Sequence, residues 1–200
     1  MKDDPRSKNV IFRIDSIDSY LQDYSIELQN AIQSVDADQL NMAVKKLREF
    51  YSSDKNIYCI GNGGSHAIAD HLACDFVKGA YKDDNKRMRV IPLGSMASLH
   101  SAAANDFGHE NAFAQQLKFL ADHDSLLIAI SSSGNSKNII NAVKQHQSTG
   151  SVCIAMTGFD GGVLKEISNI CLHVNSYNYG IIEDSHQSLM HVLAQYLYLS

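Results

Sequence analysis

The chain has 200 residues and a net charge of −5, with 44% hydrophobic and 20% charged residues. This composition is typical of a globular protein that buries a sizeable core. The acidic balance argues against a nucleic-acid-binding protein, which carries a basic surface. No apolar run is long enough to span a membrane, and the polar start of the chain does not resemble a signal peptide.

Four cysteines stand far apart and form no CxxC pair. Cys59, Cys153 and Cys171 lie inside apolar runs with strand character, which is typical of reduced core thiols. We therefore expect a cytoplasmic protein with no membrane and no nucleic-acid partner.

The N-terminal quarter of the chain, residues 1–52, reads as a helical arm. Residues 1–10 are polar and expected to be loose. From Ile14 to Tyr51, apolar residues recur every three or four positions, and Asp36 marks a break between two helices. The apolar stripe of this arm could pack on a partner subunit or on its own core, and the pattern leaves both open.

Apolar runs alternate with helical patterns through the rest of the chain. The predicted strands are 56–61, 89–94, 125–131, 151–158 and 170–175, and the last predicted helix is 183–199. Repeated strand-helix units predict an α/β fold whose parallel sheet is covered on both faces. We expect a single domain spanning residues 1–200.

Two loops stand where strands give way to helices. The glycine loop, residues 61–65, reads GNGGS, and its glycines allow close backbone approach to an anion at a helix N-terminus. The serine loop, residues 131–136, reads SSSGNS and offers four hydroxyls. Either loop alone could be a turn with an N-cap, but together they favour a phosphate site. Neither matches a dinucleotide or Walker fingerprint, so we expect a small phosphate ester.

Imidazoles and carboxylates recur at helical spacing near these loops. His71 and Asp75 are four residues apart, and Glu183, Gln187 and His191 step along the last helix at intervals of four. Such groups could bind zinc, transfer protons, or merely form surface ion pairs. Three other histidines near the loops, His66, His100 and His186, are expected at surface or packing positions.

Taken together, these segments resemble the SIS (sugar isomerase) domain family, and within it the phosphoheptose isomerases. The matching segments are GNGGSHAIADHLACDF, ANDFGHENAF, LLIAISSSGNSKNIINAV, MTGFDGG and IIEDSHQSLMHVL. The resemblance implies a three-layer α/β/α sandwich with a five-stranded parallel sheet. It also implies a homotetramer with active sites between subunits.

The resemblance assigns roles to particular residues. It implies that the sugar phosphate is bound by Asn62, Gly63, Gly64, Asn105, Asp106, Ser131, Ser132, Ser133 and Ser136, with further contacts from Asp75 and Glu183. It implies a zinc ion held by His71, Asp75, Glu183 and His191. Asp75 would be the catalytic base and His191 the catalytic acid.

Several positions depart from the pattern of these isomerases. Asp75 stands where a glutamate is expected, and Glu183 where a glutamine is expected. The shorter carboxylate changes proton-transfer geometry, and the added charge attracts a cation. Gly79 replaces an expected arginine, and Gly180 with Ile181 replaces an acidic-basic pair.

The implied activity is isomerisation of sedoheptulose 7-phosphate to glycero-manno-heptose 7-phosphate through an enediol, for activated heptose and surface polysaccharide. The departures leave open another sugar phosphate as substrate. A non-catalytic phosphosugar-binding regulator is the other alternative, and the retained metal-binding residue types argue against it.

Overall fold

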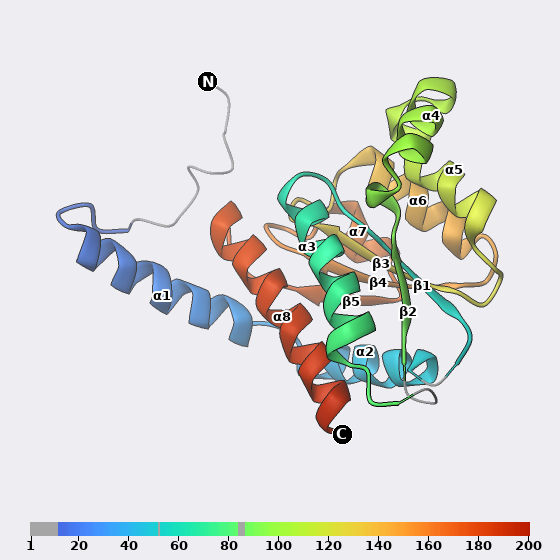
Figure 1. Cartoon of the computed structure of the whole chain (residues 1–200). Helices are drawn as coiled ribbons and strands as arrows, with labels where there is room; N and C mark the ends of the chain where they lie inside the picture. Colours follow the sequence, from blue (N-terminus) through green and yellow to red (C-terminus); the bar gives the residue numbers. More distant parts are fainter. Residues whose placement is uncertain (1–11, 52, 84–86) are drawn as a thin grey trace.

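The centre of the molecule is a five-stranded sheet in which all neighbouring strands are parallel (Figure 1). The computed structural model describes residues 12–51, 53–83 and 87–200. From edge to edge the order is β2 (Arg89–Pro92), β1 (Asn56–Ile60), β3 (Leu126–Ser131), β4 (Val152–Thr157) and β5 (Ile170–His173). This sheet confirms the predicted α/β architecture.

Helices cover both faces of the sheet, because neighbouring strand residues point to opposite faces and both sets are apolar. Along β3, Leu126 and Ile128 belong to one buried cluster, while Leu127 and Ala129 belong to the other. The first cluster is covered by α2 (Ala37–Phe50), α3 (Gly64–Cys74), the π-helix η2 (Asp75–Gly79) and α8 (Tyr179–Leu199). The second is covered by α5 (Ala112–Leu120), α6 (Lys137–Gln147) and α7 (Gly162–Ile167).

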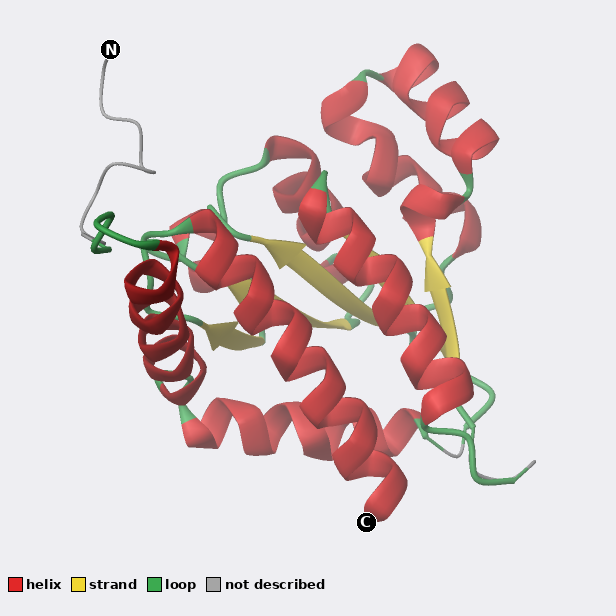
Figure 2. Ribbon diagram, turned by 60° about the vertical axis from the view of Figure 1, so that its left-hand side comes forward, coloured by secondary structure: helices red, strands yellow, loops and turns green. Residues whose placement is uncertain are grey.

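The helical arm consists of α1 (Ile17–Gln33) and α2, separated at Asp36 as predicted. The Asp36 side chain caps α2 by accepting from the amides of Asp38 and Gln39. Helix α1 lies beside α8 (Figure 2), so part of the arm packs on its own core. Residues 1–10, expected to be loose, lie outside the described part of the chain.

Side chains from the α1–α2 turn and from the start of α2 bind the backbone at and just after β5. The Gln39 side chain accepts a hydrogen bond from the Cys171 amide at 2.9 Å, and the Ser34 hydroxyl accepts one from the Asn175 amide at 2.9 Å. Edge strands expose unpaired backbone groups, and the Gln39 side chain satisfies one of them, the Cys171 amide. These two hydrogen bonds attach the helical arm to the β5 side of the sheet, in addition to its packing against α8.

Some boundaries differ from the predicted ones. The last helix begins at Tyr179 rather than at residue 183, because the Asn178 side chain caps it by accepting from the Ile181 amide. The strand predicted for 89–94 ends at Pro92 and continues as the 3₁₀-helix η3 (Leu93–Ser95). After η3 come α4 (Ala97–Phe107), the 3₁₀-helix η4 (His109–Asn111) and α5. Among the described helices, none has the length and apolar character needed to cross a membrane.

Candidate active site

The glycine loop joins β1 to α3 at the carboxyl edge of the sheet. Gly63 has a φ of 53°, a conformation that side chains disfavour. A Cβ on Gly61 would lie 2.3 Å from the carbonyl oxygen of Ser65, so only glycine fits there. The loop therefore brings the first turn of α3 close to the end of β1, and its N-terminal amides face the same edge as the serine loop.

The serine loop follows β3, the neighbouring strand, and leads into α6. Ser131 and Ser132 are buried, with exposed fractions of 5% and 6%. The Ser132 hydroxyl oxygen is buried and has no hydrogen-bond partner among the described residues. A buried hydroxyl without a partner is costly, so this loop is shaped to meet a polar ligand.

Two asparagines hold the loops together. Asn62 and Asn138 exchange side-chain hydrogen bonds of 2.9 and 2.8 Å, and Asn138 is 2% exposed. Asn138 lies on α6, just beyond the serine loop. Its role was not predicted from the sequence, where it follows Ser136 and Lys137 without any distinguishing pattern.

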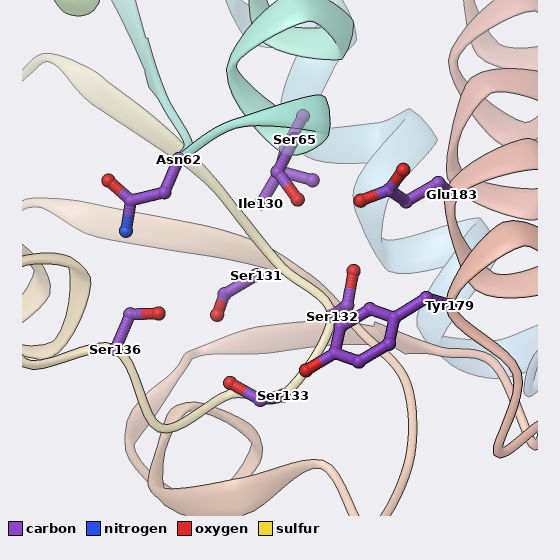
Figure 3. Close-up of a pocket in the computed structure, with 9 residues that line it drawn as sticks. All are labelled: Asn62, Ser65, Ile130, Ser131, Ser132, Ser133, Ser136, Tyr179 and Glu183. Atoms are coloured by element: carbon purple, nitrogen blue, oxygen red, sulfur yellow. The ribbon is translucent and has the colours of Figure 1, made fainter. Parts of the chain in front are cut away.

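The two loops and α8 enclose one pocket, shown in Figure 3. Its lining residues are Asn62, Ser65, Ile130, Ser131, Ser132, Ser133, Ser136, Tyr179 and Glu183. Hydroxyls and amides dominate this serine pocket, and the only charged lining residue is Glu183. Ser65 and Tyr179 were not predicted as site residues, although Ser65 belongs to the glycine loop. Such a pocket can bind a phosphate through neutral donors.

Further along α3 and α8, two histidines flank a carboxylate. His191 Nε2 lies 3.2 Å from Asp75 Oδ2, and His71 Nε2 lies 3.6 Å from Asp75 Oδ1. The imidazole rings meet edge to face, with centroids 4.9 Å apart. We call His71, Asp75 and His191 the acid–base cluster. Each offers a ligand atom within 4.8 Å of the others, and nitrogen and oxygen donors of this kind suit Zn²⁺.

Asp75 stands at a change of helix type. The α-helix α3 ends at Cys74, and the π-helix η2 runs on from Asp75, with the Ala80 amide donating to the Asp75 carbonyl at 2.8 Å. Because His71 is one α-helical turn earlier, the two side chains still share a face. Single π turns of this kind are frequent at functional sites.

Burial shifts the pKa values of two ionisable side chains near the site, Glu183 and His186. Burial, followed by the charge of Asp184, raises the pKa of Glu183. His186 is fully buried, and burial lowers its pKa to about 4, so it packs in the core in a neutral form. His66 faces Asp70 at 3.5 Å, and His100 Nδ1 accepts from the Gln116 side-chain amide nitrogen at 2.9 Å.

Comparison with known proteins shows the family of this chain. The SIS domain family matches residues 19–158. The chain is 34% identical over 166 residues to the phosphoheptose isomerase of Helicobacter pylori strain P12, covering 83% of this chain and 85% of that protein. The chain belongs to the phosphoheptose isomerases of the SIS domain family.

Solved structures of this family share the fold over nearly the whole chain. The phosphoheptose isomerase from Francisella tularensis matches with a TM-score of 0.84 and 27% identity, covering 94% of this chain and 98% of that one. The phosphoheptose isomerase from Neisseria gonorrhoeae matches with a TM-score of 0.82 and 26% identity, covering 92% and 97%. The fold expected from the family resemblance is therefore confirmed.

Not every residue expected from the family meets in one place. Glu183 lines the serine pocket, and its carboxylate lies against Gly64, where a Cβ would be 2.5 Å from Oε2. It is not part of the acid–base cluster. Asn105 and Asp106 are exposed on α4, hydrogen-bonded to each other at 2.9 Å, and do not line the pocket.

The departures from the family pattern have local structural consequences. Gly180 leaves room for the Tyr24 hydroxyl of α1, which would lie 3.1 Å from a Cβ at that position. Tyr24 donates to Asp184 Oδ2 at 2.5 Å, and burial followed by this bond raises the Tyr24 pKa. The arm thus occupies the start of α8, where the acidic-basic pair was expected.

Proposed function

We propose that this phosphoheptose isomerase converts sedoheptulose 7-phosphate to glycero-manno-heptose 7-phosphate. The observation that carries the proposal is the partnerless Ser132 hydroxyl in the serine pocket. That pocket is lined in part by α3 and α8, the helices that lead to the acid–base cluster. A phosphate would supply the acceptor that this hydroxyl lacks. The product would enter activated heptose and surface polysaccharide synthesis, as in the family.

The spacing along α3 suits a long sugar. Ser65 lines the pocket, and His71 stands six residues later, about 9 Å along the helix axis. An extended chain gains about 1.2 Å per bond, so C2 of a seven-carbon 7-phosphate lies roughly 8 Å from its phosphorus. The phosphate can then occupy the serine pocket while C1 and C2 reach the acid–base cluster.

We assign the proton transfers to Asp75 and His191. The Asp75 carboxylate removes a proton from C1 of the ketose, and a ring N–H of His191 gives its proton to the C2 oxygen, which produces the enediol. Asp75 then returns its proton to C2, and His191 takes the hydroxyl proton from the oxygen on C1, which completes the aldose. The 3.2 Å contact between the two groups keeps both beside the same two carbons.

A zinc ion would be held by His71, Asp75 and His191. The family resemblance makes Glu183 the proposed fourth ligand, although its carboxylate lies in the serine pocket outside this cluster. The chemistry of this donor set supports the fit, since two imidazole nitrogens and a carboxylate converge within 4.8 Å. When bound, Zn²⁺ supplies a Lewis acid that polarises the carbonyl.

We further propose a cytoplasmic homotetramer in which Asn105 and Asp106 complete the site of another subunit. Two exposed apolar residues of α1, Ile17 and Leu21, support an interface on the arm, with exposed fractions of 78% and 60%. The four cysteines are unpaired thiols, which suits a reducing compartment.

The decisive test follows sedoheptulose 7-phosphate by NMR in deuterated water, with and without added zinc. Deuterium at the exchanged carbon and an aldose product, both lost in Asp75→Asn, would support the isomerase and its base. Binding without exchange in the zinc-loaded wild type would overturn the proposed reaction.

A further inference from the structure

Gln187 connects the last helix to the acid–base cluster. It lies on α8, one turn after Glu183 and one turn before His191. Its side-chain amide reaches across to α3, where the amide nitrogen is 2.7 Å from His71 Nδ1. The sequence places this residue on the same helix face as Glu183 and His191, but the proposed reaction assigns it no role.

This contact is the only hydrogen bond that orients the His71 ring within the described part of the chain. The 3.6 Å between His71 Nε2 and Asp75 Oδ1 exceeds a hydrogen-bond distance. The His71 side chain is 48% exposed, so packing alone does not fix it. The orientation and the proton position of His71 therefore depend on Gln187.

The two ring nitrogens have different tasks. Nε2 lies on the Asp75 side of the ring, and it can bind a cation only through its lone pair, which requires the proton to be on Nδ1. A proton on Nδ1 needs an acceptor. A half-turn of the Gln187 amide exchanges its nitrogen and oxygen and presents that acceptor to Nδ1 at the same distance.

We propose that Gln187 is a positioning residue that holds His71 with Nδ1 protonated and Nε2 open toward the cluster. The proposal rests on the zinc assignment in the proposed function. Groups that orient a ligating histidine through its second nitrogen strengthen metal binding by about 10- to 100-fold. The opposite arrangement, with the amide nitrogen toward Nδ1, would place the proton on Nε2 and exclude it as a ligand.

The test measures zinc affinity of the full chain by competition with a chromogenic chelator. Gln187→Leu is expected to weaken binding by about 10- to 100-fold. Gln187→Glu offers only acceptors and should retain at least wild-type affinity. Gln195→Leu, an exposed change on the same helix, is the matched control and should leave affinity unchanged. Unchanged thermal unfolding of each variant shows that the fold is retained.

A His71→Ala background separates positioning from general disturbance. There, Gln187→Leu should cost no further affinity, because the ring that it positions is gone. Equal losses in both backgrounds, or a wild-type affinity for Gln187→Leu, would overturn the proposal for Gln187 alone. If the single variant His71→Ala binds zinc as tightly as the wild type does, the zinc assignment fails, and the role of Gln187 fails with it.

Discussion

Asn62 and Asn138 join the glycine loop to the serine loop through two reciprocal amide hydrogen bonds, of 2.9 and 2.8 Å. The pair lies at the boundary between the pocket and the core, because Asn62 lines the pocket and Asn138 is buried on α6. Reciprocal bonds fix both the distance and the relative rotation of the two loops. The pair therefore links the stability of the fold to the geometry of the phosphate site.

Replacing Asn138 with alanine should affect both properties. The change removes both bonds of the pair and the contact from the Asn138 oxygen to the Ile139 amide, so we expect a loss of about 1–3 kcal/mol in unfolding free energy. The KM for the sugar phosphate should rise as the loops separate. Urea denaturation and initial-rate kinetics measure the two effects, with Gln145→Ala on the same helix as control. A destabilised variant with unchanged KM would contradict the link.

Replacing Ser132 with alanine should weaken substrate binding without lowering the stability of the fold. Its hydroxyl is buried without a partner, so Ser132→Ala removes a desolvated polar group and should leave stability unchanged or raise it by about 1 kcal/mol. A lost hydrogen bond to a charged phosphate should raise KM by about 10-fold or more. Thermal unfolding and kinetics, compared with Ser148→Ala, test both signs. An unchanged KM would place the phosphate elsewhere.

Features set by local sequence could be predicted. The glycine and serine loops and the cap at Asp36 depend on neighbouring residues, and the face shared by His71 and Asp75 follows from helical periodicity. The two-sided burial of the sheet follows from continuous apolar runs.

Features set by the packing of distant segments could not be predicted from the sequence. The Asn62–Asn138 pair joins residues 76 apart, and the Gln187–His71 contact joins residues 116 apart. Both depend on the relative position of helices, which periodicity does not determine. The contact of Glu183 with Gly64 has the same origin, since spacing on α8 alone could not show whether that carboxylate joins the pocket or the cluster.

His186 should make stability depend on pH. Burial holds its pKa at about 4, below the ordinary 6.5, so between these values the unfolded chain binds a proton that the folded chain excludes. Stability from this group is complete above pH 6.5 and is lost as pH falls toward 4, by about 3 kcal/mol.

The variant His186→Met should flatten this dependence. Methionine fills the buried space without a titrating group, so we expect unfolding free energy at pH 4.5 to approach its value at pH 7. Urea denaturation across this range measures the slope. His109→Ala, at an exposed position, serves as control and should keep the wild-type slope. A slope retained in His186→Met would assign the pH dependence to other groups.

The exposed stripe on α1 should be an interface between subunits. Ile17 and Leu21 lie one turn apart on α1, and both are exposed. Ala31 of the same helix is buried in the core. Changing both to aspartate should dissociate the oligomer without unfolding it, because neither side chain is buried in the single chain. Activity should fall with dissociation, since we propose that Asn105 and Asp106 complete a neighbour's site. Sedimentation velocity and circular dichroism measure assembly and folding, with Gln22→Asp as a control for charge on the same helix. An intact oligomer in the double variant would show that the arm does not form the interface.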